Sequence, residues 1–294
     1  MTVESYRPES AWTGNQETWE SSLRETRSEE TRSESNRFFT HEVQENASQE
    51  TAWGAHEETK ASMLREHGEV MSAEQRRMLE SDETKGKIHV LSAESYLEQF
   101  PKADLNVVGH CDEYGNIYMK EISPNAVRHV TTHETMHLCA HREVNALTDG
   151  SSGREVISGL RRTEIRGNEI SSINTSVNEG FTQMYTLREL RGRGEYAAAA
   201  EISSYEKSVE WAQRMEGLLG KETCADAYFG EGYETMVKEF NRLNGDETAW
   251  RSFSENMEVF NDREATPREQ KLAELKIERQ YLTMAKARMA ERRN

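Results

Sequence analysis

The run His133-Glu134-Thr135-Met136-His137 constrains this chain more than any other feature of its sequence. In a helix, side chains four residues apart lie on one face about 5–6 Å apart, so both imidazoles can bind one zinc ion. Glu134 lies between them, where a carboxylate can take the proton from water at the metal. With 9 histidines and 53 acidic residues in 294 positions, chance gives at most about 0.05 such matches. The motif therefore predicts a helix that carries a zinc site.

This helix is expected to run from about residue 126 to residue 144. A catalytic zinc site needs three protein ligands and one open position for water. Glu143 could be the third ligand only if the helix ended after His137, and no helix-breaking residue follows there. Asp149, in a loop beyond the helix, is another candidate.

We expect Glu179 to be the third ligand. It lies near the start of a second predicted helix, and Gly180 beside it lets two helices approach closely. Thr182 and Gln183 lie within about one turn and could orient its carboxylate. The segment from Ser176 to Glu179 is also a capping box, in which Glu179 would only bind the Ser176 amide. The sequence leaves both readings open.

The HETMH motif, followed some forty residues later by NEGFTQ, resembles the gluzincin branch of the zincin-like metallopeptidases. It is similar, more loosely, to bacterial zinc peptidases with an anthrax lethal-factor-like catalytic domain. The resemblance covers roughly residues 87–245. It implies a zincin-like fold with a small sheet and two active-site helices. The site residues that it implies are the zinc ligands His133, His137 and Glu179 and the general base Glu134.

Three further features relate to this resemblance. The families often supply a tyrosine or histidine that stabilises the oxyanion, and Tyr185 and Tyr205 are candidates without a matching motif. The stretch Asn116–Glu121 is a candidate edge strand against which an extended substrate could align. The run Ala227–Gly230 is similar to bacterial proteins of this type, but no chemistry follows from it.

Residues 1–85 differ from the rest of the chain. They are dense in Glu, Ser, Thr and Arg, the pentad ETRSE occurs twice in tandem, and apolar residues are isolated. Such a segment buries too little surface to offset its ordering entropy, so we expect a largely disordered acidic arm. Its aromatic residues Trp12, Trp19, Trp53 and Phe38-Phe39 could dock a partner. One short helix is expected after Ser72, which begins a capping-box pattern.

The remaining chain has short predicted strands first and helices afterwards, which indicates an α+β fold. We therefore expect three parts: the arm at 1–85, a zincin-like catalytic domain at 86–250, and an amphipathic helical tail at 251–294. The tail should form a helix from Pro267 that packs on the domain or self-associates.

Composition and charge exclude several classes of protein. The formal net charge of −16 opposes general binding to nucleic acid. No stretch is apolar enough to span a membrane, and the first residues do not have the pattern of a secretory signal. Three widely spaced cysteines make no disulfide framework. We expect a cytoplasmic protein, or one exported without a cleaved signal peptide.

The sequence thus predicts a zinc metallopeptidase that hydrolyses peptide bonds with a zinc-bound water activated by Glu134. Its cofactor would be Zn²⁺ and its partner a protein or peptide substrate, with docking through the arm as a further option. The alternative is a non-catalytic helical interaction or scaffold protein in which the HExxH motif is incidental.

Overall fold

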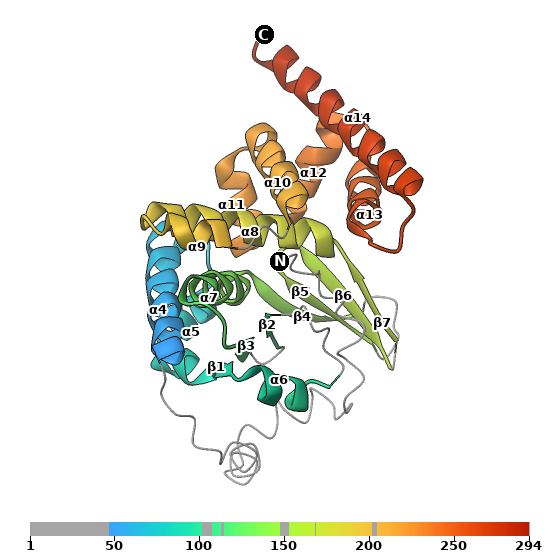
Figure 1. Ribbon diagram of the computed structural model, residues 1–294. Coiled ribbons are helices and arrows are strands. Elements are labelled where there is room, and N and C mark those ends of the chain that lie inside the picture. The colour runs from blue at the N-terminus through green and yellow to red at the C-terminus, as the bar shows by residue number, and fades with distance from the viewer. Residues whose placement is uncertain are drawn as a thin grey trace.

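The computed structural model describes residues 47–101, 108–112, 115–147, 153–167, 169–201 and 205–293. Two small β-sheets lie among helices, which confirms the predicted α+β class. Helices from the two ends of the described chain lie on different sides of the molecule (Figure 1). Three predicted features fall outside the described ranges: the arm over residues 1–46, its aromatic anchors other than Trp53, and the candidate ligand Asp149. Trp53 lies in a described helix and is half-buried.

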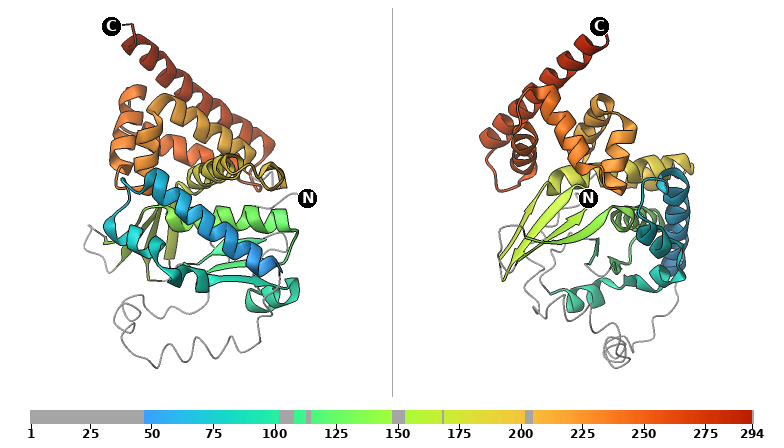
Figure 2. Two further views of the ribbon diagram at one scale, coloured as in Figure 1. Left: turned by 90° about the vertical axis from the view of Figure 1, so that its left-hand side faces the viewer. Right: turned by 180° about the vertical axis from the view of Figure 1, so that it is seen from behind.

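Residues 1–85 were predicted to be disordered apart from one short helix after Ser72, and this is wrong for the rest of residues 47–85. Residues 47–87 form three helices: α4 (Ala47–His67), α5 (Ala73–Glu80) and the 3₁₀ helix η1 (Asp82–Lys87). Helix α4 packs along the helix that carries HETMH and buries Ala52, Ala55 and Met63 (Figure 2). The predicted domain boundary at residue 86 therefore cuts through folded structure.

Helix α5 begins where the sequence predicted a short helix. The Ser72 hydroxyl accepts a hydrogen bond from the Gln75 amide and caps the helix. The side chain of Gln75 also donates to the carbonyl of Cys139, the last residue of the HETMH helix. Residues assigned to a free arm thus satisfy a backbone group at the end of a central helix.

The first sheet has the order β1-β3-β2, with β1 parallel and β2 antiparallel to β3. The HETMH helix packs on one face through Val127 and Val130, and α6 (Ala93–Gln99) packs on the other face. The stretch Asn116–Glu121 was predicted as an edge strand, but it forms the central strand because a strand pairs on each side of it. The strands are β1 (Ile88–Leu91), β2 (Gly109–Cys111) and β3 (Ile117–Lys120).

Helix α7 (Pro124–Cys139) carries HETMH. The Ser123 hydroxyl accepts from the Ala126 amide, and Pro124 occupies the first turn, where it removes no helical hydrogen bond. The helix ends at Cys139, not near residue 144. The predicted end was wrong because the chain leaves the helix to pair as a strand from Arg142 onward, a tertiary effect that the local sequence does not show.

An antiparallel meander in the order β4-β5-β6-β7 connects α7 to the helix that carries Glu179. Strands β6 and β7 pair as a hairpin with its turn near residue 167. Gly167 has a φ of 59°, a left-handed conformation that suits glycine. The strands are β4 (Arg142–Ala146), β5 (Arg154–Ser158), β6 (Arg161–Arg166) and β7 (Glu169–Ile173).

Glu179 lies on α8 (Thr175–Gly192), which packs against α7 and is followed by α9 (Tyr196–Glu201). The remaining helices lie on the side of α8 away from the sheets, and the largest apolar core forms among them and α8 (Figures 1 and 2). They are α10 (Glu206–Leu219), α11 (Lys221–Phe229), α12 (Tyr233–Asn244), α13 (Ala249–Asn261) and α14 (Pro267–Glu291).

The predicted C-terminal helix begins at Pro267 and packs on the domain, as expected. Thr266 and Glu269 form a complete capping box at its start, and the helix packs against α10, α12 and α13. None of the described helices carries an apolar run that could cross a lipid bilayer.

Candidate metal centre

His133, His137 and Glu179 converge on one point between α7 and α8. Oε2 of Glu179 lies 3.3 Å from Nε2 of His133 and 3.4 Å from Nε2 of His137. The three ligand atoms all lie within 4.8 Å of one another. A tetrahedral ion with bonds of about 2.0–2.1 Å separates its ligands by about 3.3–3.4 Å. The two imidazole nitrogens and the carboxylate oxygen therefore fit a metal ion such as zinc.

The capping-box reading of Glu179 is wrong. Helix α8 begins at Thr175, and both the amide and the hydroxyl of Ser176 bind the carboxylate of Glu258 on α13, at 3.0 and 2.7 Å. The Ser176 amide thus has another acceptor, and Glu179 is left to face the two histidines. The start of α8 is capped by a carboxylate from a distant helix.

Gly180 allows a close approach of helices, but not of the pair that was expected. A Cβ atom at Gly180 would lie 2.6 Å from the carbonyl oxygen of Ser208 on α10. The glycine therefore lets α8 pack tightly on α10 rather than on α7. Glu179, the residue before Gly180, faces the histidines of α7.

The imidazole of His133 is held by a chain of hydrogen bonds. Its Nδ1 lies 2.8 Å from Oε1 of Gln183, whose Nε2 lies 2.9 Å from Nε2 of His129. Nδ1 of His129 lies 2.8 Å from the carbonyl of Ala198. A carbonyl accepts only, so His129 carries its proton on Nδ1, accepts from the Gln183 amide, and leaves Oε1 to accept from His133. When the His133 ring is neutral, its proton therefore lies on Nδ1, and Nε2 offers a lone pair toward Glu179.

The imidazole of His137 is also held through its Nδ1, by Thr182. Its Nδ1 lies 3.4 Å from Oγ1 of Thr182, which accepts from the phenol of Tyr228 at 2.7 Å and donates to the carbonyl of Asn178. Thr182 and Gln183 were expected to orient Glu179, but they contact the histidines. Tyr228 belongs to the run Ala227–Gly230, whose resemblance to bacterial proteins was the only sequence signal for its place beside the site.

Glu134 is buried beside the three ligands. Burial raises the pKa of its carboxyl above the ordinary value, and the neighbouring histidines oppose this rise. The backbone N–H of Cys111, on the edge strand β2, donates to the carboxylate. A carboxylate that is desolvated and held by one hydrogen bond is placed to accept a proton.

Glu179 and the two histidines stabilise one another's charged forms. Burial alone would raise the pKa of Glu179, but the charges and hydrogen bonds of His137 and His133 hold it well below its ordinary value. Burial opposes the charging of His133, whereas Glu179 and Glu134 raise its pKa. A bound cation would take over the role of the imidazolium protons opposite Glu179.

The two candidate tyrosines lie in different places. Tyr205 stacks on the ring of His133, with ring centroids 5.9 Å apart and planes 6° apart. Burial, together with the Glu179 and Glu134 carboxylates, raises the pKa of its phenol well above the ordinary value. Its φ of 68° is unusual for a residue other than glycine, and such strain is often found at functional sites. Tyr185 instead packs between His67 and Phe229, away from the ligands.

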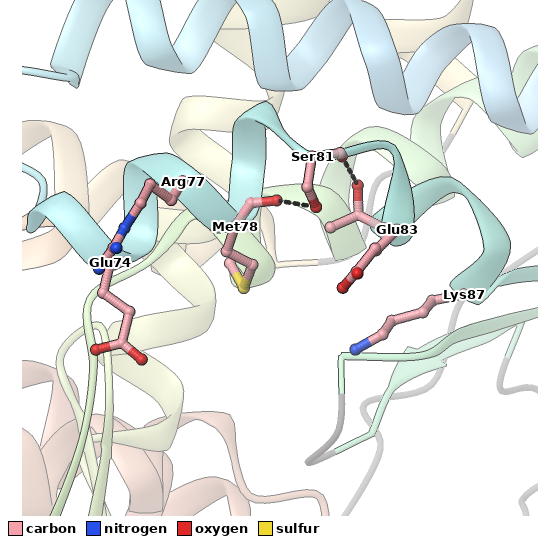
Figure 3. Close-up of a pocket in the computed structure, with 7 residues that line it drawn as sticks. Glu74, Arg77, Met78, Ser81, Glu83 and Lys87 are labelled. Atoms are coloured by element: carbon pink, nitrogen blue, oxygen red, sulfur yellow. Dashed lines mark hydrogen bonds between the residues drawn. The ribbon is translucent and has the colours of Figure 1, made fainter. Parts of the chain in front are cut away.

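The other candidates do not join the cluster among the described residues. Glu143 lies on β4, and its carboxylate faces His141 at 3.6 Å. A surface pocket between α5 and η1 is also separate from the site, and Figure 3 shows how polar its wall is. The pocket is lined by Glu74, Arg77, Met78, Ser81, Glu83, Thr84 and Lys87.

Comparison of the chain with protein families, with curated proteins and with solved structures finds no match.

Proposed function

We propose that this protein is a zinc-dependent metallopeptidase of the zincin-like class that hydrolyses peptide bonds in a protein or peptide substrate. The observation that carries the proposal is the placement of Glu179. Two histidines on one helix face arise easily, but a carboxylate 42 positions after His137 reaches both of their Nε2 atoms. This spacing supports zinc with a fourth position open.

The surroundings of the cluster also favour a site over an incidental motif. Each histidine has its Nδ1 bonded to a side chain of α8, so both Nε2 atoms face the same point. Such supports are typical of metal-binding histidines, because they fix the ring orientation and the tautomer. A scaffold protein with an incidental HExxH motif would not need these hydrogen bonds to Nδ1.

The chemistry follows from the groups around the ligands. Zinc would act as a Lewis acid that polarises a carbonyl and lowers the pKa of water. Glu134 would accept the proton of the attacking water and pass it to the leaving amine. The phenol of Tyr205 keeps its proton and can donate to the developing oxyanion.

The edge strand β2 supports a peptide as substrate. Among the described strands β2 pairs on one side only, with β3, and its residue Cys111 contacts Glu134. An extended peptide beside β2 would therefore run past the general base. The strand predicted for this role, Asn116–Glu121, is instead paired on both sides.

The proposal is tested by incubating the full chain with a peptide library derived from a proteome and reading the products by mass spectrometry. Wild-type protein should give cleavage that 1,10-phenanthroline abolishes. Glu134→Gln keeps the size of the side chain but cannot accept a proton, so it should retain zinc and lose at least ~10²-fold of the rate. Zinc-loaded wild-type protein that cleaves no peptide, or a Glu134→Gln protein of normal rate, would refute the assignment.

A further inference from the structure

Helix α14 has a second apolar face that points away from the molecule. Its inner face packs on the domain through Ala273, Ile277 and Met284, which are buried. On the outer face Leu272, Leu275, Leu282 and Met289 are 54%, 56%, 48% and 54% exposed. Soluble domains seldom expose large apolar side chains in a row, and such rows mark binding surfaces. Figure 1 shows α14 on the outside of the molecule, with its C-terminal end projecting beyond the other helices.

The outer residues follow the spacing of a coiled-coil seam. Together with Arg268, Arg279 and Lys286, the four apolar residues recur along α14 at alternating steps of four and three residues, and all seven are exposed. This repeat is the a/d pattern, which places side chains on one line facing a partner helix. Ile277 and Met284, seven residues apart, occupy the opposite line toward the domain. The seam, which we call the outer stripe, consists of Arg268, Leu272, Leu275, Arg279, Leu282, Lys286 and Met289.

The outer stripe is cationic on a strongly acidic chain. It holds three basic residues and no acidic one, whereas the whole chain has a formal net charge of −16. The side chains of Arg279 and Lys286 are exposed and form no ion pair with any other described residue. Their charges are therefore available to a partner.

We propose that the outer stripe of α14 binds an acidic amphipathic helix of a partner protein. Apolar side chains of that helix would cover the leucines, and its carboxylates would pair with Arg279 and Lys286. The surface lies on the C-terminal helices and does not depend on the metal centre. It provides a recognition site separate from the metal ligands.

Charge disfavours a second copy of the same helix as the occupant. In a parallel pair Arg279 and Lys286 would each face their own copies across the seam. In an antiparallel pair the seam would still contain both basic residues of each chain and no carboxylate. Like charges in one seam are destabilising, whereas an acidic helix neutralises them.

A membrane surface fits less well for a different reason. Helices that lie on bilayers present a broad apolar face, often with aromatic residues, and keep their basic residues on the polar side. Here Arg279 and Lys286 lie within the apolar line itself, and its one neighbouring aromatic residue, Tyr281, packs inward on Trp211. The outer stripe is narrow and alternately apolar and basic.

The test uses the full chain and a synthetic peptide of three heptads with leucine at a and d and glutamate at e and g. The control peptide has lysine in place of glutamate. Binding is measured by fluorescence anisotropy at low and high salt. We expect the acidic peptide to bind at least tenfold more tightly than the lysine peptide, and salt to weaken this binding.

Two variants place the binding on the outer stripe. Leu275→Gln/Leu282→Gln and Arg279→Glu/Lys286→Glu should each weaken binding of the acidic peptide at least tenfold while circular dichroism stays unchanged. Tyr196→Gln removes an exposed aromatic residue on α9 and should bind like wild type. The proposal is overturned if the wild-type chain does not bind the acidic peptide or if both stripe variants bind normally. It is also overturned if the outer stripe instead drives dimerisation or binding to phosphatidylserine-containing vesicles.

Discussion

The carboxylate of Glu258 binds the amide and the hydroxyl of Ser176, one helical turn before the candidate ligand Glu179. Helix α8 has no cap from its own Asn174 side chain, so this carboxylate from α13 takes that place. The C-terminal helices therefore fix the start of the helix that carries the third ligand. The candidate metal centre depends on residues well outside the two helices that form it.

Replacing Glu258 should affect both stability and metal binding. Glu258→Ala leaves the Ser176 amide without its acceptor, and we expect a loss of about 1–2 kcal/mol in the free energy of unfolding. Zinc affinity should fall as well, because the first turn of α8 loosens. Urea denaturation and a competitive zinc titration measure the two effects. Glu255→Ala, an exposed carboxylate on the same helix, is the control, and equal behaviour of the two variants would disprove the coupling.

Gln183 should control how well His133 binds metal. Gln183→Leu removes both the acceptor for Nδ1 of His133 and the donor to His129. We expect zinc affinity to fall by ~10–100-fold. Gln183→Glu keeps an acceptor for His133, so its zinc affinity should lie between those of wild type and Gln183→Leu. Zinc affinities of the three proteins are compared by chelator competition; an unchanged affinity in Gln183→Leu would show that the ring of His133 needs no such support.

Helix α4 should contribute substantially to stability, contrary to the prediction of a free arm. Met63 is buried against the main core, and Met63→Ala should cost about 2–5 kcal/mol. Met289→Ala, at an exposed position, should change stability by less than about 0.5 kcal/mol. Thermal and urea denaturation of the two variants make the comparison. A small effect at Met63 would mean that α4 packs only loosely.

The buried His56 should make stability depend on pH. Its ring lies between Thr135 and Thr84, and burial and then the charge of Lys60 lower its pKa to about 3. In the unfolded chain the pKa is about 6.5. Between these values the unfolded state binds a proton that the folded state does not. The free energy of unfolding should therefore fall as the pH drops, by up to about 1.4 kcal/mol per unit.

His56→Gln removes this titrating group and is the variant that isolates it. Urea denaturation of both metal-free proteins between about pH 7 and pH 4 should show a steeper decline for wild type. The difference between the two curves of unfolding free energy against pH measures the proton that His56 takes up on unfolding. Parallel curves would show that His56 is not buried in its neutral form.

Some of this fold could be predicted because local signals agree with it. The HETMH spacing, the capping-box pattern after Ser72 and the C-terminal segment from Pro267 all predict helices, and helices form there. The end of α7 could not be predicted, because no residue after Cys139 breaks a helix. The pairing of β4 with β5 ends it, and that pairing involves residues further along the chain.

Helix α4 could not be predicted for a different reason. Apart from Met63, its buried residues are small or polar, so it lacks the apolar periodicity that marks a helix. His56 and Lys60 are buried there because Thr84 bonds to both. Polar residues that find partners only in the folded state look like solvated residues in the sequence.

The candidate site divides in the same way. The spacing of HETMH alone identified His133, Glu134 and His137. For Glu179 the sequence allowed two roles, metal ligand or capping partner of Ser176. The structure excludes the second, because Ser176 binds Glu258. The supports of the histidines were placed on the correct helix but assigned to the wrong ligand. A helical wheel shows which residues share a face of a helix, but not which other element packs against that face.

If His133, His137 and Glu179 hold one zinc ion, the metal content of three purified proteins will show it. We predict about one zinc per chain in wild type and in Ser176→Ala, which removes a hydroxyl but no ligand. Glu179→Ala should lose its zinc on dialysis against a mild chelator, because two remaining ligands bind weakly. A wild-type protein without zinc, or a Glu179→Ala protein that retains zinc, would contradict a zinc site formed by these three residues.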